Sequence, residues 1–196
     1  LGENGKLFAF DQDLDALNNA IDDERFTLIN ENFRFIKRFL RFHGIKQVDG
    51  ILADLGVSSH QFDVAERGFS TRFDAELDMR MNQKGDISAY HVVNEYDEQE
   101  ISRVLFNYGE LKNARAMANV IVTARKDKER KNAEQLKQVL AKFLPGHKSN
   151  KILAQIYQAI RIEVNQEMDV LKEFLQQARE ILNPEGRLSV ISYHSL

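Results

Sequence analysis

The chain has 196 residues, of which 43% are apolar and 29% are charged, so its composition is that of a folded globular protein rather than a disordered one. It contains no cysteine, which excludes a disulfide scaffold and a thiolate metal site and is compatible with a reducing, cytoplasmic setting. It has no apolar run of about 18 residues, so we expect no membrane-spanning helix.

The net charge of −3 conceals a basic segment within an acidic chain. Residues 112–151 hold eleven Lys and Arg against three Asp and Glu. Such a segment can form a nucleic-acid contact surface, and the solvated outer faces of helices are the alternative.

The first sixty residues alternate between apolar segments and helical patterns. We predict strands at residues 6–10, 25–30 and 48–54. A helix capped by Asp13 follows the first strand, and a helix from Phe33 that stops near Gly44 follows the second. This strand–helix order predicts an α/β fold with a parallel sheet.

Three side chains follow the predicted strands. Asp54 ends an apolar run that predicts a strand buried on both faces, and ligands of open α/β sheets bind beyond the carboxyl ends of such strands. Asp11 stands where a carboxylate commonly holds the two hydroxyl groups of a nucleotide ribose. Phe33 could stack on a purine ring. The alternatives are an acidic cap for Asp54 and Asp11, and an ordinary core position for Phe33.

After Gln61 the alternation breaks. Residues 65–81 are rich in charge and have no clean period, which is typical of a functional or disordered loop. Its arginines could contact phosphates, or they could pair with Asp74 and Asp78. The arginines in question are Arg67, Arg72 and Arg80.

Helical patterns then dominate as far as residue 150. Asp97 with Glu100, and Asn132 with Gln135, have the spacing of capping boxes. We interpret residues 64–150 as an inserted all-helical subdomain and residues 1–63 and 151–196 as the core. The predicted helices are at residues 88–94, 98–108, 114–125, 133–143, 152–164 and 166–182, before a turn at 183–186 and a strand at 187–192.

Three segments resemble one known family. They are DGILADLGVSSHQFDVAERGFSTRFDAELDMRM (residues 49–81), QIYQAIRIEVNQE (residues 155–167) and GRLSVISYHSL (residues 186–196). They are similar to the bacterial methyltransferases of the MraW/RsmH family. The resemblance implies a Rossmann-like class I methyltransferase core with an inserted helical domain. It also implies S-adenosyl-L-methionine as cofactor and the exocyclic N4 of a cytosine in 16S ribosomal RNA of the small subunit as target.

The matched motifs also imply roles for single residues. Asp11 matches the ribose-binding carboxylate, Phe33 an aromatic beside the adenine, and Asp54 and Gln61 two further cofactor contacts. From their position at the end of the third predicted strand, the Asp54 carboxylate and the backbone carbonyls of residues 56–58 are the alternatives for holding the reacting amino group, and the sequence identifies no general base. For the RNA substrate we expect contacts from Ser58, Arg67 and Arg80.

The sequence departs from the family in three places. The glycine-rich loop expected in the cofactor cradle would lie before Leu1, so we expect the chain to be part of a longer one. His60 stands where the family usually has proline. Gln155 and Ile156 replace an Arg-Thr pair, which removes a candidate substrate arginine.

Other functions stay open from sequence alone. The chain could be a nucleotide-binding Rossmann module of another class, or an RNA-binding relative without catalysis. The five histidines have no metal-ligand spacing, so we predict no bound metal. The oligomeric state is open, with a homodimer among the alternatives.

Overall fold

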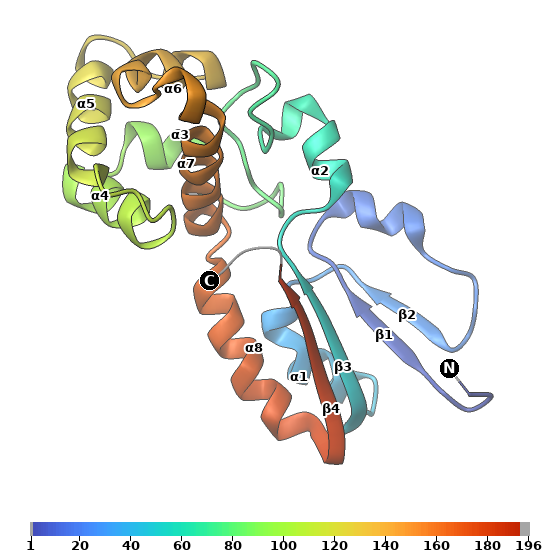
Figure 1. Cartoon of the computed structure of the whole chain (residues 1–196). Coiled ribbons are helices and arrows are strands. Elements are labelled where there is room, and N and C mark those ends of the chain that lie inside the picture. Colours follow the sequence, from blue (N-terminus) through green and yellow to red (C-terminus); the bar gives the residue numbers. More distant parts are fainter. Residues whose placement is uncertain (1, 193–196) are drawn as a thin grey trace. The chain divides into compact units, whose positions relative to one another are not determined.

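The computed structural model describes residues 2–192, which form two compact units (Figure 1). The described part of unit 1 comprises residues 2–56, 81–83 and 168–192, and that of unit 2 comprises residues 57–80 and 84–167. The YHSL end of the third family motif lies outside the described residues.

The boundaries of the units differ from those predicted at residues 63/64 and 150/151. Both α2 (Ser59–Asp63) and α7 (Ser149–Val164) belong to unit 2, although the sequence pattern placed them in the core. The reason for α7 is its packing, because it contacts two helices of unit 2, α3 and α4.

Unit 1 contains the parallel strands that the alternating pattern predicts. Among the described residues they form two two-stranded sheets, β1 with β2 and β3 with β4. All four strands run toward the same end of the unit (Figure 1). Their bounds are β1 (Leu7–Phe10), β2 (Phe26–Ile29), β3 (Val48–Leu55) and β4 (Leu182–Ser192).

The helices of unit 1 follow the prediction with one change of type. The first, η1 (Leu14–Asn19), is a 3-10 helix that ends before Ile21, which is exposed. The second begins as η2 (Phe33–Phe35), continues as α1 (Ile36–Phe42) and is followed by Gly44 at φ 77°. Near the carboxyl end of the chain, α8 (Glu167–Ile181) leads into β4.

The core of unit 1 lies on one face of β3. Ala53 is buried there against side chains of α1 and α8, and Ile51 and Leu55 pack on the same cluster. Leu52 points to the other face and is 69% exposed. The prediction of a strand buried on both faces is therefore wrong for the described residues, because the two helices cover only one face.

The predicted turn at residues 183–186 is part of β4. Val48 pairs with Leu182, whereas Gly50 already pairs with Arg187, so the register shifts and four residues of β4 lie opposite one residue of β3. Glu185 is one of these four and has φ 67°. The pairing with β3 resumes at Arg187 after this NPEG segment.

Unit 2 is helical, and α7 is its longest helix. Leu153, Ile156 and Ile160 of α7 are buried, and α5 packs against α4. None of the helices within residues 2–192 is long and apolar enough to cross a membrane. The remaining elements of the unit are η3 (Ala65–Arg67), α3 (Ala89–Asn94), α4 (Glu98–Asn107), α5 (Ala114–Asp127), α6 (Ala133–Val139), η4 (Ala141–Phe143) and η5 (Gly146–Lys148).

One predicted capping box is complete and the other is not. Asp97 and Glu100 exchange both hydrogen bonds at the start of α4. Asn132 accepts the Gln135 N–H as predicted, but the Gln135 side chain accepts the N–H of Lys131 instead of closing the box.

Candidate functional site

The carboxyl end of β1 carries two carboxylates with different surroundings. Asp13 is only 4% exposed and caps η1 through the N–H of Asp15, so it is the helix cap that the sequence predicts. Asp11 is exposed, and one of its oxygens accepts the N–H of Asp13 at 2.9 Å. Since a carboxylate offers about four acceptor positions, Asp11 can also accept hydroxyl groups of a ligand.

Two asparagines join the end of β2 to the end of β1. The amide of Asn30 donates to the carbonyl oxygens of Asp11 at 2.9 Å and Asp13 at 3.1 Å. The amide of Asn32 donates to the side-chain oxygen of Gln12 at 2.9 Å. The two strand ends are thus held together by side chains beyond the backbone ladder.

Phe33 is both a core residue and a partly exposed ring. It opens η2, whose first turn is capped by the side chain of Asn32. Its ring packs edge-on against Phe174, with the ring centroids 5.2 Å apart. The side chain is half-buried, so part of the ring remains accessible beyond β2.

Asp54 is the penultimate residue of β3 and is exposed. Together with Asp11 and Phe33 it lies at the end of unit 1 to which all four strands run (Figure 1). The structure therefore places these three predicted residues at the carboxyl ends of parallel strands, and their roles stay predictions.

Ser58 and Gln61 belong to unit 2 and form a capping box at the start of α2. The Ser58 hydroxyl accepts the Gln61 N–H, and the Gln61 side-chain oxygen accepts the Ser58 N–H, both at 3.2 Å. Gln61 is only 5% exposed. Sequence reasoning assigned these residues to ligands and missed their structural role. His60, at the family's proline position, leaves the box intact.

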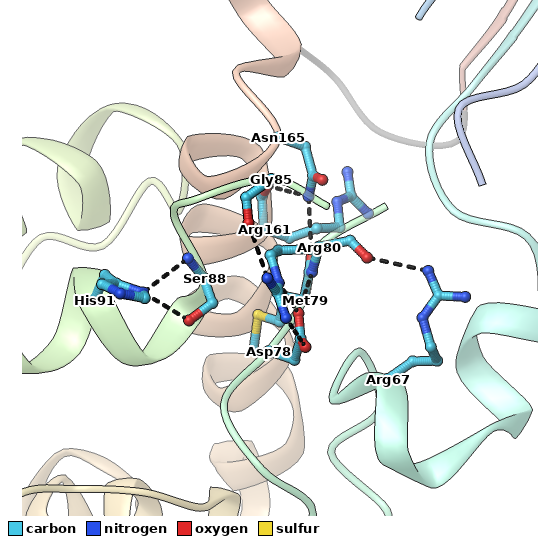
Figure 2. A network of polar contacts seen from close by, with 9 residues as sticks. All are labelled: Arg67, Asp78, Met79, Arg80, Gly85, Ser88, His91, Arg161 and Asn165. Carbon is cyan, nitrogen blue, oxygen red and sulfur yellow. Dashed lines mark hydrogen bonds and ion pairs between the residues drawn. The ribbon is translucent and has the colours of Figure 1, made fainter. Parts of the chain in front are cut away.

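Arg67 and Arg80 hold their own loop together (Figure 2). Arg80 forms a bidentate ion pair with Asp78, with both distances 2.8 Å, and donates to the carbonyl oxygen of Gly85. Arg67 is 6% exposed and donates to the carbonyl oxygen of Arg80 at 3.0 Å. The phosphate contacts predicted for both arginines are therefore not supported by their positions, since both guanidinium groups face protein acceptors.

The sequence left open whether the loop arginines pair with Asp74 and Asp78, and within the described residues the structure shows such a pair for Asp78 only. Burial raises the pKa of Asp78, but the hydrogen bonds from Arg80 lower it more, so that the pKa lies below its ordinary value. Arg72 pairs with Asp63 rather than with Asp74. Asp74 instead accepts the N–H of Glu134 at the start of α6.

The loop at residues 65–81 is closely packed rather than irregular. Met79 is fully buried at φ 60°, its N–H donates to the carbonyl of Arg67, and its carbonyl accepts the amide of Asn165 at 2.8 Å (Figure 2). Gly68 has φ 71°, and a Cβ there would lie 2.4 Å from the carbonyl oxygen of Glu76. Both positions require left-handed backbone, which for methionine persists only where surrounding contacts fix it.

The polar residues of the family motif on α7 fasten neighbouring elements. Each donates to a carbonyl or pairs with an opposite charge within unit 2, so the motif serves the scaffold. The pairs are Gln155 with the Gly109 carbonyl, Gln158 with the Tyr108 carbonyl, Arg161 with Glu167, and Glu163 with Arg103.

A pocket of about 230 Å³ lies in unit 2. Tyr157 lines it, and burial, together with the charges of Asp74 and Glu134, raises the pKa of this tyrosine to about 12. Tyr157 is therefore a neutral hydroxyl at physiological pH. Arg72 and Lys137 also line the pocket, which makes its charge mixed.

Comparison with known proteins decides the family. All 196 residues match the model of the MraW methylase family. The chain belongs to this family. The MraW chain is 76% identical to the protein named ribosomal RNA small subunit methyltransferase H of Flavobacterium johnsoniae, and the match covers 100% of this chain and 65% of that protein.

Relatives of the same name in other bacteria are also similar. The Flavobacterium psychrophilum protein is 71% identical over 100% of this chain and 67% of its own length. The Bacteroides thetaiotaomicron protein is 50% identical over 100% of this chain and 64% of its own length. The chain thus spans about two thirds of the length of these relatives.

Sequence reasoning missed three residues that lie at the candidate site, namely Gln12, Asn30 and Asn32. A signal was present, because asparagine directly after a strand commonly holds turns through its side chain. Only the structure shows that these turns belong to Asp11 and Phe33. Within residues 2–192, no group of three or more His, Asp and Glu side chains is placed to hold a metal ion.

Proposed function

We propose that this MraW-family chain is part of an enzyme that transfers a methyl group from S-adenosyl-L-methionine to the exocyclic N4 of a cytosine in 16S ribosomal RNA, in the cytoplasm. The observation that carries the proposal is the position of Asp11, Phe33 and Asp54 at one end of unit 1, in a chain whose entire length matches the family. We further propose that unit 1 is the Rossmann-like cofactor-binding core and that unit 2 contains the helical insertion.

The residues beyond β1 and β2 fit the adenosine part of this cofactor. The exposed Asp11 carboxylate can accept hydrogen bonds from the ribose hydroxyl groups, and such charged bonds contribute about 1.5–3 kcal/mol each. The half-buried Phe33 ring offers an apolar surface for the adenine. Gln61 is proposed as a further contact through α2, in addition to its capping role.

When bound, S-adenosyl-L-methionine supplies an electrophilic methyl group. The N4 of cytosine is a weak nucleophile because its lone pair is conjugated with the ring, so acceptors must hold the amino hydrogens and orient the lone pair. Asp54 offers a carboxylate for this purpose, and the backbone carbonyls directly after β3 offer a second set. If Asp54 is engaged by the cofactor, the carbonyls take this role.

The ribosomal RNA requires a different set of contacts from those expected. Arg67 and Arg80 are engaged within the loop, and Ser58 caps α2. Exposed basic residues of unit 2 suit phosphates better, because long cationic side chains at the surface neutralise RNA charge without leaving an internal partner unpaired. These residues are Lys112, Arg115, Lys126, Lys128, Lys142, Lys148 and Lys151.

The direct test combines binding and turnover in the natural, full-length protein. Calorimetric titration with S-adenosyl-L-methionine is expected to give saturable heat that S-adenosylhomocysteine abolishes. Incubation with small ribosomal subunits lacking the modification is expected to transfer one methyl group to a cytosine N4, detected by mass spectrometry of nucleosides. Absence of cofactor binding, or methylation of another atom, would overturn the proposal.

A further inference from the structure

The carboxyl ends of β1 and β2 are joined by two asparagines that stand two residues apart. Asn30 donates to two carbonyls, those of Asp11 and Asp13, and so fixes the backbone on both sides of Gln12. An asparagine amide has two hydrogens, and here each has an acceptor. The segment that carries the Asp11 carboxylate is therefore held from the neighbouring strand.

The second asparagine acts in two directions. Its side-chain oxygen accepts the N–H of Arg34 at 2.9 Å and thereby caps the turn that begins at Phe33. Its amide donates to Gln12, whose own amide lies 3.5 Å from the sulfur of Met81. Asn32 thus connects the turn of Phe33 to the residue next to Asp11.

Adenosine has two binding groups whose spacing is nearly fixed. Its adenine and its ribose diol are separated by a fixed covalent distance, so two groups that contact both gain affinity only if their own spacing is fixed. Backbone pairing between β1 and β2 reaches as far as the Asp11 N–H, which donates to the Ile29 carbonyl at 3.2 Å, whereas the residues that follow Asp11 and the turn of Phe33 lie beyond it. The two asparagines restrain these segments beyond the ladder.

We propose that Asn30 and Asn32 are positioning residues that hold Asp11 and Phe33 at the spacing of an adenosine. This inference rests on the proposed function, because it assumes that these two residues contact the cofactor. Asn30 acts on the ribose side through Asp11, and Asn32 acts mainly on the adenine side through Phe33.

Two variants of the full-length protein separate these actions. Asn30→Ala removes both donors to the Asp11 segment. Asn32→Ser keeps a short oxygen that can cap the turn of Phe33 but removes the amide that reaches Gln12. Asn119→Ala is the matched control, because the Asn119 amide also makes a side-chain hydrogen bond, to Glu98 in unit 2.

The measurement is calorimetric affinity for S-adenosylhomocysteine and for its 2′-deoxy analogue. Asn30→Ala is expected to weaken the first about fivefold to tenfold and the second much less, so that the preference for the ribose hydroxyl declines. Asn32→Ser is expected to weaken both ligands equally, by about threefold to fivefold. Asn119→Ala should bind both ligands as the wild type does.

In Asn30→Ala, a structural role alone would change the melting temperature and leave the preference for the 2′-hydroxyl as in the wild type. In Asn32→Ser, a structural role alone would change the melting temperature and leave both affinities as in the wild type. Wild-type affinity and preference in both asparagine variants would overturn the inference and leave the proposed function standing. A wild-type protein that binds neither ligand would overturn the proposed function and the inference together.

Discussion

At the scale of single residues, Asp78 illustrates how a charge is fixed in a loop. Its carboxylate accepts two hydrogen bonds from the Arg80 guanidinium and one from the Arg80 backbone N–H at 3.0 Å. Both side chains are 29% exposed, so the pair is partly shielded from water. Hydrogen bonds to the charged form lower the pKa of the carboxyl group, which links the loop to pH.

Replacing Asp78 by Asn is expected to lower the free energy of unfolding by about 1–3 kcal/mol at pH 7, because Arg80 loses its anionic partner. The folded-state pKa lies below the ordinary value of 3.8. The contribution is therefore fully present above that value and is lost as the pH falls through the folded-state pKa. Urea unfolding at pH 7 and at pH 3 should show a difference between wild type and variant that shrinks on acidification.

Asp63→Asn serves as the control for this experiment. Asp63 also pairs with an arginine, Arg72, but the two side chains are 69% and 63% exposed. Exposed pairs contribute little, so the variant should lose no more than about 0.5 kcal/mol. Equal losses of unfolding free energy in the two variants would show that the Asp78–Arg80 pair stabilises the protein no more than an exposed ion pair does.

Asp11→Ala should leave folding nearly unchanged and weaken S-adenosyl-L-methionine by at least about 1.5 kcal/mol, or about tenfold. This follows from the proposed role of Asp11, whose exposed carboxylate lies outside the core and would accept charged hydrogen bonds from a bound ribose. Calorimetric titration measures the affinity, with the exposed Asp22→Ala as control. An unchanged affinity would reduce Asp11 to a turn residue.

The sequence distinguishes polar residues with a structural role from candidate ligand contacts only in part. Asp13 and Asp97 are recognisable as caps because their partners lie two or three residues away. The partner of Arg67 is the carbonyl of Arg80, and every arginine in a charged loop has many carbonyls within reach. Local spacing therefore predicts caps well, whereas it cannot choose between a phosphate and a distant carbonyl.

At the scale of elements, the turn that ends η3 lies directly against the backbone of the segment that leads to Met79. Gly68 allows this approach because its φ is 71° and because a Cβ would lie 2.4 Å from the Glu76 carbonyl oxygen. Two constraints, backbone conformation and crowding, coincide at this one residue.

Gly68→Ala is expected to lower the free energy of unfolding by at least about 3 kcal/mol, from left-handed strain plus the backbone clash. Gly44→Ala is the matched control, since Gly44 has φ 77° but no atom within 4 Å of its Cβ position, and should lose only about 1 kcal/mol. Thermal and urea unfolding measure both. Similar losses of unfolding free energy in the two variants would show that the backbone around Gly68 shifts to accommodate a Cβ atom at little cost.

Strands and helices were predictable because each depends on a pattern contained in its own residues. The predicted bounds of β1, β2, α4 and α5 agree with the observed ones within a few residues. The exposure of Leu52 and the register shift between Val48 and Gly50 were not predictable, because both depend on what lies beside β3. A run of apolar residues indicates a strand but does not say how many of its faces are covered.

At the scale of the whole molecule, the charge of the chain is unevenly divided along the sequence, and residues 112–151 are strongly basic. Replacing Lys142, Lys148 and Lys151 together by Ala should weaken binding to ribosomal RNA and reduce the slope of log affinity against log salt. If each contacts one phosphate of a single strand, the slope should fall by about 2.

Matched changes at exposed basic residues of unit 1 provide the control for this experiment. Lys6, Arg38 and Lys46 are exposed and are outside the basic segment, so their joint replacement by Ala should leave the salt slope nearly unchanged. Filter binding over a series of salt concentrations measures both triple variants. Equal slopes for the two would assign RNA binding to overall charge rather than to unit 2.

The pairing of β3 with β4 has a consequence for synthesis of the chain. Val48 pairs with Leu182, so β3 leaves the ribosome long before its partner exists, on the order of ten seconds at ordinary translation rates. Every described residue of unit 2 emerges in that interval. The helical unit can therefore complete its folding before β4, the partner of β3 among residues 2–192, has left the ribosome. Until β4 emerges, the edge of β3 that β4 later covers is open to pairing with strands of other chains.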